Sequence, residues 1–333
     1  MKGNVRRVLL VLPEARVLES GVALGLDVWL VRAAHQGVTL QAGPPERQLT
    51  GDVDDVGALR ALLVETARAF DITDILYFGD LPGPRLAVGL ALLELYPGQA
   101  RALEGLADPA ALRRVLNQGG VSVVRAVRVS SVAAALTWSD GFPYPFVIRD
   151  GTGRGRGEII QDEAQLDAWA RRSPRMPCVI EDHLAGPEVA VETFSHAGMH
   201  EVVGVTAVCS RVVEACAGVV PAGHGKVADG GDAAGAELVA GTEVVEGAAK
   251  AADAEVVAAR TVVRALLDLV GLEFGFVRTR VVLTPAGPRV AEVEVAGGSV
   301  PAAAGHGAGR DVVVDVLGVL AGRPPGGPWQ LSN

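Results

Sequence analysis

The sequence predicts an α/β unit at its N-terminal end, followed by a longer region of α+β structure. Of its 333 residues, 49% are hydrophobic and 21% are charged, as expected of a globular chain with a sizeable buried core. Apolar strand patterns alternate with helical patterns up to Tyr96, which is typical of a small parallel sheet. After Gly119 and Gly120 the pattern changes to short strands joined by tight turns, which favours antiparallel pairing.

Composition and charge argue against several classes of protein. Three cysteines are too few for a disulfide-stapled secreted scaffold, so a reducing, cytoplasmic compartment is expected. The formal net charge of -9 repels a phosphate backbone, which argues against nucleic acid as a partner. The apolar run 8–12 is interrupted by Pro13, and the run 86–96 is far shorter than the ~20 residues that a bilayer needs. Neither a signal peptide nor a membrane span is expected.

Strands and helices alternate along the N-terminal unit. Strands are predicted at 5–12, 28–31 and 72–78, and helices at 22–26, 56–70 and 85–96. A further helix over 109–118 has Asp108 as its N-cap and Pro109 at its first position. The short strands that follow are predicted at 121–129, 146–149, 158–161, 178–181, 189–194 and 201–208.

The last third of the chain combines a glycine-rich loop, a long helix and a hairpin. Residues 223–242 lack an apolar period and are expected to form a surface loop, a candidate lid. Apolar residues at helical spacing predict one packed helix over 248–270 and a last helix over about 310–320. Strands at 278–283 and 289–295 flank a turn at 285–287, which predicts a hairpin.

The stretch 151–157 (GTGRGRG) lies between two predicted strands and is a candidate phosphate-binding loop. Alternating glycines allow backbone N–H groups to converge, and Arg149, Arg154 and Arg156 add positive charge. A dinucleotide fingerprint requires the loop to open a helix, and a Walker motif requires a glycine spacing that is absent before Lys226. The dinucleotide-binding and Walker motifs are therefore rejected. Taken alone, the stretch is explained equally well by phosphate binding and by a flexible hairpin tip.

Two further segments gather charged residues. The acidic turn 181–188 (EDHLAGPE) suits a nucleoside, but taken alone a solvated acidic turn is the favoured interpretation. In the hairpin, period two places Arg278 and Arg280 on one strand face and Glu292 and Glu294 on one face of the return strand. A three-residue turn would set Arg280 across from Glu292 and Arg278 across from Glu294. The cluster is either two solvated ion pairs or a site for Mg²⁺ and phosphoryl oxygens.

Histidine, cysteine and serine patterns indicate no further site. His196 and His200 have HxxxH spacing but flank a predicted turn at Ala197 and Gly198, where that spacing does not bring the two rings together. The cysteines lack CxxC spacing and are expected to act as small apolar residues. Ser130, Ser131 and Ser195 lack the GxSxG context of a hydrolase nucleophile, so the hydrolase hypothesis is rejected.

Taken in chain order, these pieces resemble the ATP-grasp superfamily, and within it carboxylate–amine ligases such as amino-acid ligases and D-alanine–D-alanine ligase. The resemblance covers nearly the whole chain and is carried by residues 111–121, 141–149 with the glycine loop, 162–166, 181–188 and 275–298. It implies an ATP-grasp fold with an N-terminal Rossmann-like (pre-ATP-grasp) domain. The implied parts are that domain at 1–105, a central subdomain with the glycine loop at 106–184, and a C-terminal subdomain with the metal/phosphate hairpin at 185–333.

The resemblance also implies roles for individual residues. In the family, a cation and a glycine loop hold the ATP phosphates, a hinge holds adenine, and a glutamate holds ribose. The implied cofactor-binding residues are Arg149, Gly153, Arg154, Gly155, Arg156, Glu181, His183, Leu184 and Glu188. The implied catalytic residues are Arg278 and Arg280, and the implied metal ligands are Glu292 and Glu294.

Several positions depart from the family pattern. Arg280 occupies a position where the family carries a metal-binding Asp or Glu, and Ala296 stands where many relatives have an arginine. Asp108-Pro109-Ala110 replaces an upstream phosphate-binding lysine, and arginine at position 149 keeps the charge but not the shape of lysine. Two carboxylates facing two arginines sum to zero charge, which is a poor site for the two Mg²⁺ ions usual in the family.

The expected function is an ATP-dependent carboxylate–amine ligase that forms an acyl phosphate of an amino acid or another small carboxylate. ATP and Mg²⁺ are the implied cofactors, and a small carboxylate and an amine are the implied substrates. One alternative is a non-catalytic relative in which Arg280 pairs with Glu292, and which binds nucleotide or serves as a partner subunit. Another is a binding protein with a glycine-rich lid over a small anion. A homodimer and a complex with a partner protein both stay open.

Overall fold

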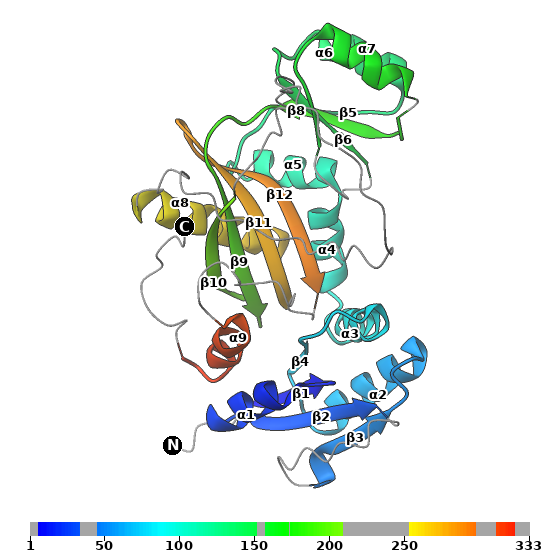
Figure 1. Cartoon of the computed structure of the whole chain (residues 1–333), viewed down its shortest axis with the longest axis vertical. Coiled ribbons are helices and arrows are strands. Elements are labelled where there is room, and N and C mark those ends of the chain that lie inside the picture. Colours follow the sequence, from blue (N-terminus) through cyan, green and yellow to red (C-terminus); the bar gives the residue numbers. More distant parts are fainter. Residues whose placement is uncertain are drawn as a thin grey trace, which may run out of the picture.

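The computed structural model describes residues 6–33, 45–151, 157–172, 174–208, 253–297 and 311–323. Within these ranges the strands form three four-stranded sheets. We call them the N-terminal sheet (residues 7–77), the central sheet (126–182) and the C-terminal sheet (188–297). Figure 1 shows the N-terminal and central sheets at opposite ends of the long axis, with the C-terminal sheet between them.

The N-terminal sheet is parallel and buried on both faces. Its strands are β1 (Arg7–Val11), β2 (Asp27–Ala33), β3 (Gln48–Gly51) and β4 (Asp74–Tyr77), in the order β3-β2-β1-β4. Its surrounding elements are α1 (Ala15–Ala23), the 3-10 turn η1 (Pro45–Arg47), α2 (Val56–Ala69) and α3 (Pro82–Leu95). Continuous apolar runs such as RVLLV suit strands that are covered on both faces. The predicted parallel α/β unit is therefore confirmed.

The central sheet is antiparallel, and helices cover one of its faces. Its strands are β5 (Ala126–Val129), β6 (Phe146–Asp150), β7 (Glu158–Ile160) and β8 (Cys178–Asp182), in the order β5-β8-β6-β7. Helices α6 (Val132–Ser139) and α7 (Glu163–Arg171) pack on the face that buries Phe146, Ile148 and Ile180. Because side chains alternate along a strand, Arg149 and Glu181 point to the opposite face.

The C-terminal sheet carries a long helix on one face and charged residues on the other. Its strands are β9 (Glu188–His196), β10 (Met199–Val208), β11 (Gly275–Thr284) and β12 (Gly287–Gly297), in the order β10-β9-β11-β12. Helix α8 (Asp253–Val270) buries Leu266 against strand residues such as Val191 and Val277. By alternation, Arg280 and Glu292 lie on the face away from α8.

Two helices connect the N-terminal sheet to the central sheet, namely α4 (Gln99–Ala107) and α5 (Pro109–Gln118). The predicted cap of α5 is confirmed, because the Asp108 side chain accepts hydrogen bonds from the N–H groups of Ala110 and Ala111. The buried Gln99 amide oxygen accepts hydrogen bonds from the N–H groups of Glu273 and Phe274 at 3.1 and 3.2 Å. Helix α4 is therefore anchored to the start of β11.

The last helix, α9 (Val312–Leu320), packs into the core of the N-terminal sheet. Asp311 caps it, and its buried residues include Val316 and Leu317. The chain thus returns to its N-terminal unit after the C-terminal sheet, as Figure 1 shows for α9 beside α1. The boundaries at 105/106 and 184/185 stay predictions.

Several short elements differ from the sequence predictions. The first helix spans Ala15–Ala23 rather than 22–26, and its buried stripe is formed by Val17, Leu18 and Gly21. The strand predicted at 121–129 begins only at Ala126, and β3, α4 and α6 were not predicted. The expected loop at 223–242 lies outside the described residues. Within the described ranges, no helix combines the length and hydropathy needed to cross a membrane.

Candidate functional site

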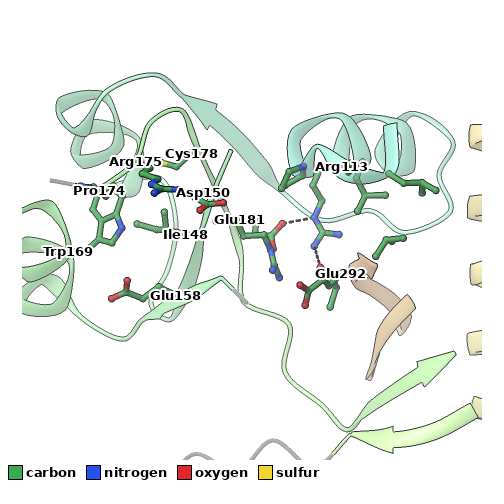
Figure 2. A pocket seen from close by; sticks show the side chains of 17 residues that line it. Arg113, Ile148, Asp150, Glu158, Trp169, Pro174, Arg175, Cys178, Glu181 and Glu292 are labelled. Atoms are coloured by element: carbon green, nitrogen blue, oxygen red, sulfur yellow. Dashed lines mark hydrogen bonds and ion pairs between the residues drawn. The ribbon is translucent and has the colours of Figure 1, made fainter. Parts of the chain in front are cut away.

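A cleft of about 240 Å³ lies between the central sheet and β12. Figure 2 shows that side chains from α5, the central sheet and β12 converge on it. Its apolar lining includes Ile148, Trp169 and Ala291. Its charged lining consists of Arg113, Arg149, Asp150, Glu158, Arg175, Glu181 and Glu292.

Glu181 is held between two arginine side chains in this cleft. Its carboxylate accepts hydrogen bonds from Arg113 Nε and Arg149 Nε, each at 2.5 Å, and only 2% of the side chain is exposed. Burial alone would raise the pKa of Glu181, but the two guanidinium groups hold that pKa below its usual range. Glu181 is therefore ionised, and the three side chains together carry one net positive charge beside the cleft.

Arg113 joins the two sheets that enclose the cleft. Besides Glu181 on β8, it donates hydrogen bonds to the carbonyl groups of Val290 at 2.6 Å and Ala291 at 3.3 Å on β12. Figure 2 shows this side chain reaching from α5 toward both partners. Ala291 is a bulge residue without a partner on β11, because the register shifts from Arg280–Glu292 to Val281–Val290.

Arg113 was not among the residues predicted for the site. It lies four residues after Pro109 and is buried on the same helix face as Leu112 and Leu116. An arginine on an otherwise apolar helix face was the available signal, because a buried charge needs a partner.

The hairpin of β11 and β12 has the predicted pairing with a different turn. Arg280 lies across from Glu292, and Arg278 lies across from Glu294. The turn contains only Pro285 and Ala286, because Thr284 pairs with Gly287. The predicted three-residue turn is wrong, and the one-residue bulge on β12 restores the predicted register.

Arg280 bridges two carboxylates on the charged face of the C-terminal sheet. Its Nη1 lies 3.0 Å from Oε2 of Glu292, and its Nε lies 3.5 Å from Oε2 of Glu188. The exposed fractions of the Arg280, Glu188 and Glu292 side chains are 16%, 20% and 10%. Both Oε2 atoms and the Nε lack an aligned hydrogen bond, so charge attraction holds the group. Glu188, the predicted ribose ligand, is therefore in contact with Arg280.

A buried glutamate that was not predicted for the site, Glu192, lies on the same face. Glu192 is 3% exposed and pairs across β9 and β11 with Arg278. Burial raises the pKa of Glu192, and Arg278 opposes that shift only in part. Gly204 on β10 leaves room for it, because a Cβ there would lie 2.4 Å from Glu192 Oε2. Period two from Glu188 was the signal that placed Glu192 on this face.

The other predicted nucleotide residues do not all reach the cleft. Gly153, Arg154, Gly155 and Arg156 lie outside the described residues. His183 and Leu184 line a separate cavity of about 470 Å³ beside the hairpin end. Of the predicted residues, Arg149, Glu181 and Glu292 line the cleft. Glu188 is connected to Glu292 by Arg280, which contacts both carboxylates.

The residues present do not fit the metal site that the family resemblance implies. Glu292 is paired with Arg280, and Glu294 is exposed across from Arg278. Each unit of positive charge placed 4 Å from a guanidinium costs about 4 kcal/mol at an effective dielectric constant of 20. In the part of the chain that the structure describes, no three acidic, His or Cys side chains cluster closely enough for a metal ion.

The histidines and Cys178 have structural surroundings. His200 Nδ1 lies 2.8 Å from Ser195 Oγ, and its Nε2 lies 3.3 Å from Asp268 Oδ1. This pairing ties β10 to α8. Cys178 is buried, and burial raises the pKa of its thiol to about 11, which leaves it protonated and unreactive.

Comparisons with known proteins bear on the fold. No family model matches the chain. A curated relative, phosphoribosylamine–glycine ligase of Leifsonia xyli subsp. xyli, is 29% identical over 189 residues, which cover 53% of this chain and 44% of the relative. The match therefore spans less than half the length of that relative.

Solved structures match over nearly the whole chain. L-amino acid ligase from Bacillus licheniformis has a TM-score of 0.53 at 19% identity, covering 96% of this chain and 75% of that one. N5-carboxyaminoimidazole ribonucleotide synthetase from Thermotoga maritima has a TM-score of 0.56 at 13% identity, covering 98% and 79%. The chain has the ATP-grasp fold. The ATP-grasp resemblance read from the sequence is confirmed at the level of fold.

Another ATP-grasp neighbour was solved with nucleotide bound. N5-carboxyaminoimidazole synthase from Aspergillus clavatus, in complex with ADP and 5-aminoimidazole ribonucleotide, has a TM-score of 0.57 at 12% identity. It covers 96% of this chain, and 78% of its own chain is matched.

Proposed function

We propose that this chain is an ATP-dependent ligase that joins a carboxylate to an amine through an acyl phosphate. The observation that carries the proposal is the cleft in which Arg113 and Arg149 converge on Glu181 beside β12. The ATP-grasp fold supports it, because the ligases with similar structures act on carboxylates and amines. An amino acid or another small carboxylate is the proposed substrate.

The proposed nucleotide lies between the central sheet and β12. Arg113, which is buried, and Arg149, which is 12% exposed, are proposed to supply positive charge for the ATP phosphates. The glycine loop, with Gly153 to Arg156, is proposed to cover those phosphates. Adenine is proposed to contact the backbone from Glu181 to Leu184, and ribose to contact Glu188.

The proposed reaction has two steps. A substrate carboxylate oxygen attacks the γ-phosphorus of ATP, the bond to the β-phosphate oxygen breaks, and ADP leaves. The amine nitrogen then attacks the acyl carbon, phosphate leaves, and the nitrogen loses a proton. Arg278 and Arg280 are proposed to stabilise the negative charge that develops on the phosphoryl oxygens. Glu188 and Glu292 hold Arg280 in position for this role.

The test is ADP release by the purified chain with pools of amino acids and small carboxylic acids. We expect release that depends on one pool and that Glu292→Gln abolishes, because this change removes a partner of Arg280. The assay is run with and without MgCl₂. The proposal is contradicted if no substrate pool causes ADP release, either with or without MgCl₂.

A second candidate is a protein that binds ATP without turning it over. The observation in its favour is the bridge from Arg280 to Glu188 and Glu292, which occupies the place of the family's metal ligands. Stabilisation by ATP in a thermal melt, together with no ADP release in the substrate assay, identifies this candidate.

A further inference from the structure

We infer that this chain binds its nucleotide without a divalent metal ion. The guanidinium of Arg280, which lies between Glu188 and Glu292, supplies the positive charge that a metal ion would bring there. The inference rests on the proposed function for the identity of the nucleotide, which is ATP or ADP. It goes beyond that function in assigning the charge to a side chain of the protein.

The backbone fixes Arg280 at this position. Strand β11 is paired on both sides, and Arg280 lies opposite Ala190 on β9 and Glu292 on β12. Its side chain reaches Glu188 and Glu292 from this central strand and is only 16% exposed. A strand held by two ladders has little freedom to move the side chain aside.

The charge balance also favours the guanidinium over a metal ion. Arginine stays protonated in proteins, so Glu188 and Glu292 always face one positive charge between them. Without the guanidinium, two largely buried carboxylates would face each other unpaired, which is strongly unfavourable. A divalent ion must therefore displace Arg280 or bind beside it. Displacement breaks two ion pairs of a side chain on a strand that is paired on both sides, and binding beside the guanidinium is opposed by charge repulsion.

The first test measures the affinity of the full chain for ATP by calorimetry in excess EDTA and in excess MgCl₂. We expect dissociation constants that agree within about threefold, because no protein-bound metal contributes. Binding that is more than about tenfold tighter in MgCl₂ overturns the inference and leaves the proposed function intact. Absence of ATP binding in both buffers overturns the proposed function and the nucleotide part of the inference together.

The second test needs no nucleotide and uses the free Mn²⁺ signal in electron paramagnetic resonance. We expect the wild-type chain to leave the signal unchanged, and Arg280→Glu to reduce it by creating a cluster with Glu188 and Glu292. Arg114→Glu reverses an exposed charge on α5, outside the C-terminal sheet, and is expected to behave as the wild type. Mn²⁺ binding by the wild type that Arg280→Glu leaves unchanged overturns the inference.

Folding of the variants is checked by thermal melting. Should Arg280→Glu fail to fold, Arg280→Gln removes the charge with less repulsion, and it is expected to weaken ATP binding in EDTA at least tenfold. Arg280→Lys keeps a positive charge and is expected to keep metal-independent binding. Unchanged ATP affinity of Arg280→Gln in EDTA overturns the inference.

Discussion

At the residue scale, the site depends on a few buried charges whose partners come from different elements. Arg113 is 3% exposed and binds Glu181 as well as two carbonyl groups of β12. Its loss would leave a buried carboxylate with one partner instead of two and two carbonyl groups without this donor. Such a group contributes to both the packing of the two sheets and the charge of the cleft.

Arg113→Ala is expected to lower the free energy of unfolding by about 3–5 kcal/mol, because it breaks a buried ion pair. Arg114→Ala removes the neighbouring exposed arginine and is expected to change the free energy of unfolding by less than about 0.5 kcal/mol. Urea unfolding of both variants provides the measurement. Equal effects of the two substitutions would contradict the role of Arg113.

Single residues were predictable where the local pattern was enough. Arg149 and Glu181 were found from a strand end and an acidic turn, and both line the cleft. Arg113 and Glu192 were missed, because their importance comes from burial beside residues far away in the sequence. The contact of Arg280 with Glu188 joins two strands about ninety positions apart, which period two cannot show.

At the element scale, the turn that leads into β9 must approach the hairpin closely. Gly186 has a φ of 149°, and a Cβ there would lie 2.2 Å from the carbonyl oxygen of Leu283. The neighbouring Pro187 carbonyl accepts a hydrogen bond from the Leu283 N–H at 2.8 Å. The glycine therefore allows the hinge between the central and C-terminal sheets to contact β11.

Gly186→Ala is expected to destabilise the chain by about 1–3 kcal/mol through backbone strain and this contact. Gly89→Ala on α3 is the matched control, because nothing lies within 4 Å of a Cβ at that helical position. The control is expected to be neutral or stabilising by up to about 1 kcal/mol. Thermal or urea unfolding decides, and a neutral Gly186→Ala would contradict the close approach.

The cap of α5 is a second element that supports the site, because this helix carries Arg113. Asp108→Ala removes the acceptor for two N–H groups and is expected to cost about 1 kcal/mol of unfolding free energy. Asp108→Asn keeps an acceptor and is expected to retain most of the stability. If the two variants unfold alike, the cap does not contribute as described.

Elements were predictable where apolar periodicity was strong, as for α2, α5 and β6. The hairpin register was right although its turn was not, because Pro285 and Ala286 alone form the turn and the bulge at Ala291 compensates. A bulge leaves no local sequence signal that distinguishes it from a longer turn. Short helices such as α4 and α6 form largely through tertiary contacts, which composition does not reveal.

At the scale of the whole molecule, the ATP-grasp fold contains three sheets that are joined by two sets of contacts. Arg113 links the central and C-terminal sheets, while α9 packs with the N-terminal core. We propose the domain boundaries 1–105, 106–184 and 185–333 from the sequence resemblance. The packing of α9 on the N-terminal core joins the C-terminal segment to the N-terminal unit.

Global stability is expected to decrease as the pH falls below about 6.5. Burial lowers the pKa of both His196 and His200. At pH values between the lowered pKa of the folded state and about 6.5, these histidines bind more protons in the unfolded chain than in the folded chain, so acid favours unfolding. Above about pH 6.5 they are neutral in both states and do not affect the free energy of unfolding. Urea unfolding at about pH 7.5 and about pH 5.5 tests this, and His200→Gln is expected to reduce the decrease. Equal stability at both pH values contradicts it.

The central claim is that nucleotide binds in the cleft of Arg113, Arg149 and Glu181, and thermal melting with ATP tests it most directly. At ~100 times its dissociation constant, ATP is expected to stabilise the wild type by about 2.7 kcal/mol. Arg149→Gln is expected to lose this protection, whereas Arg171→Gln on the exposed side of α7 is expected to keep it. Protection that survives Arg149→Gln, or its absence in the wild type, would contradict the account.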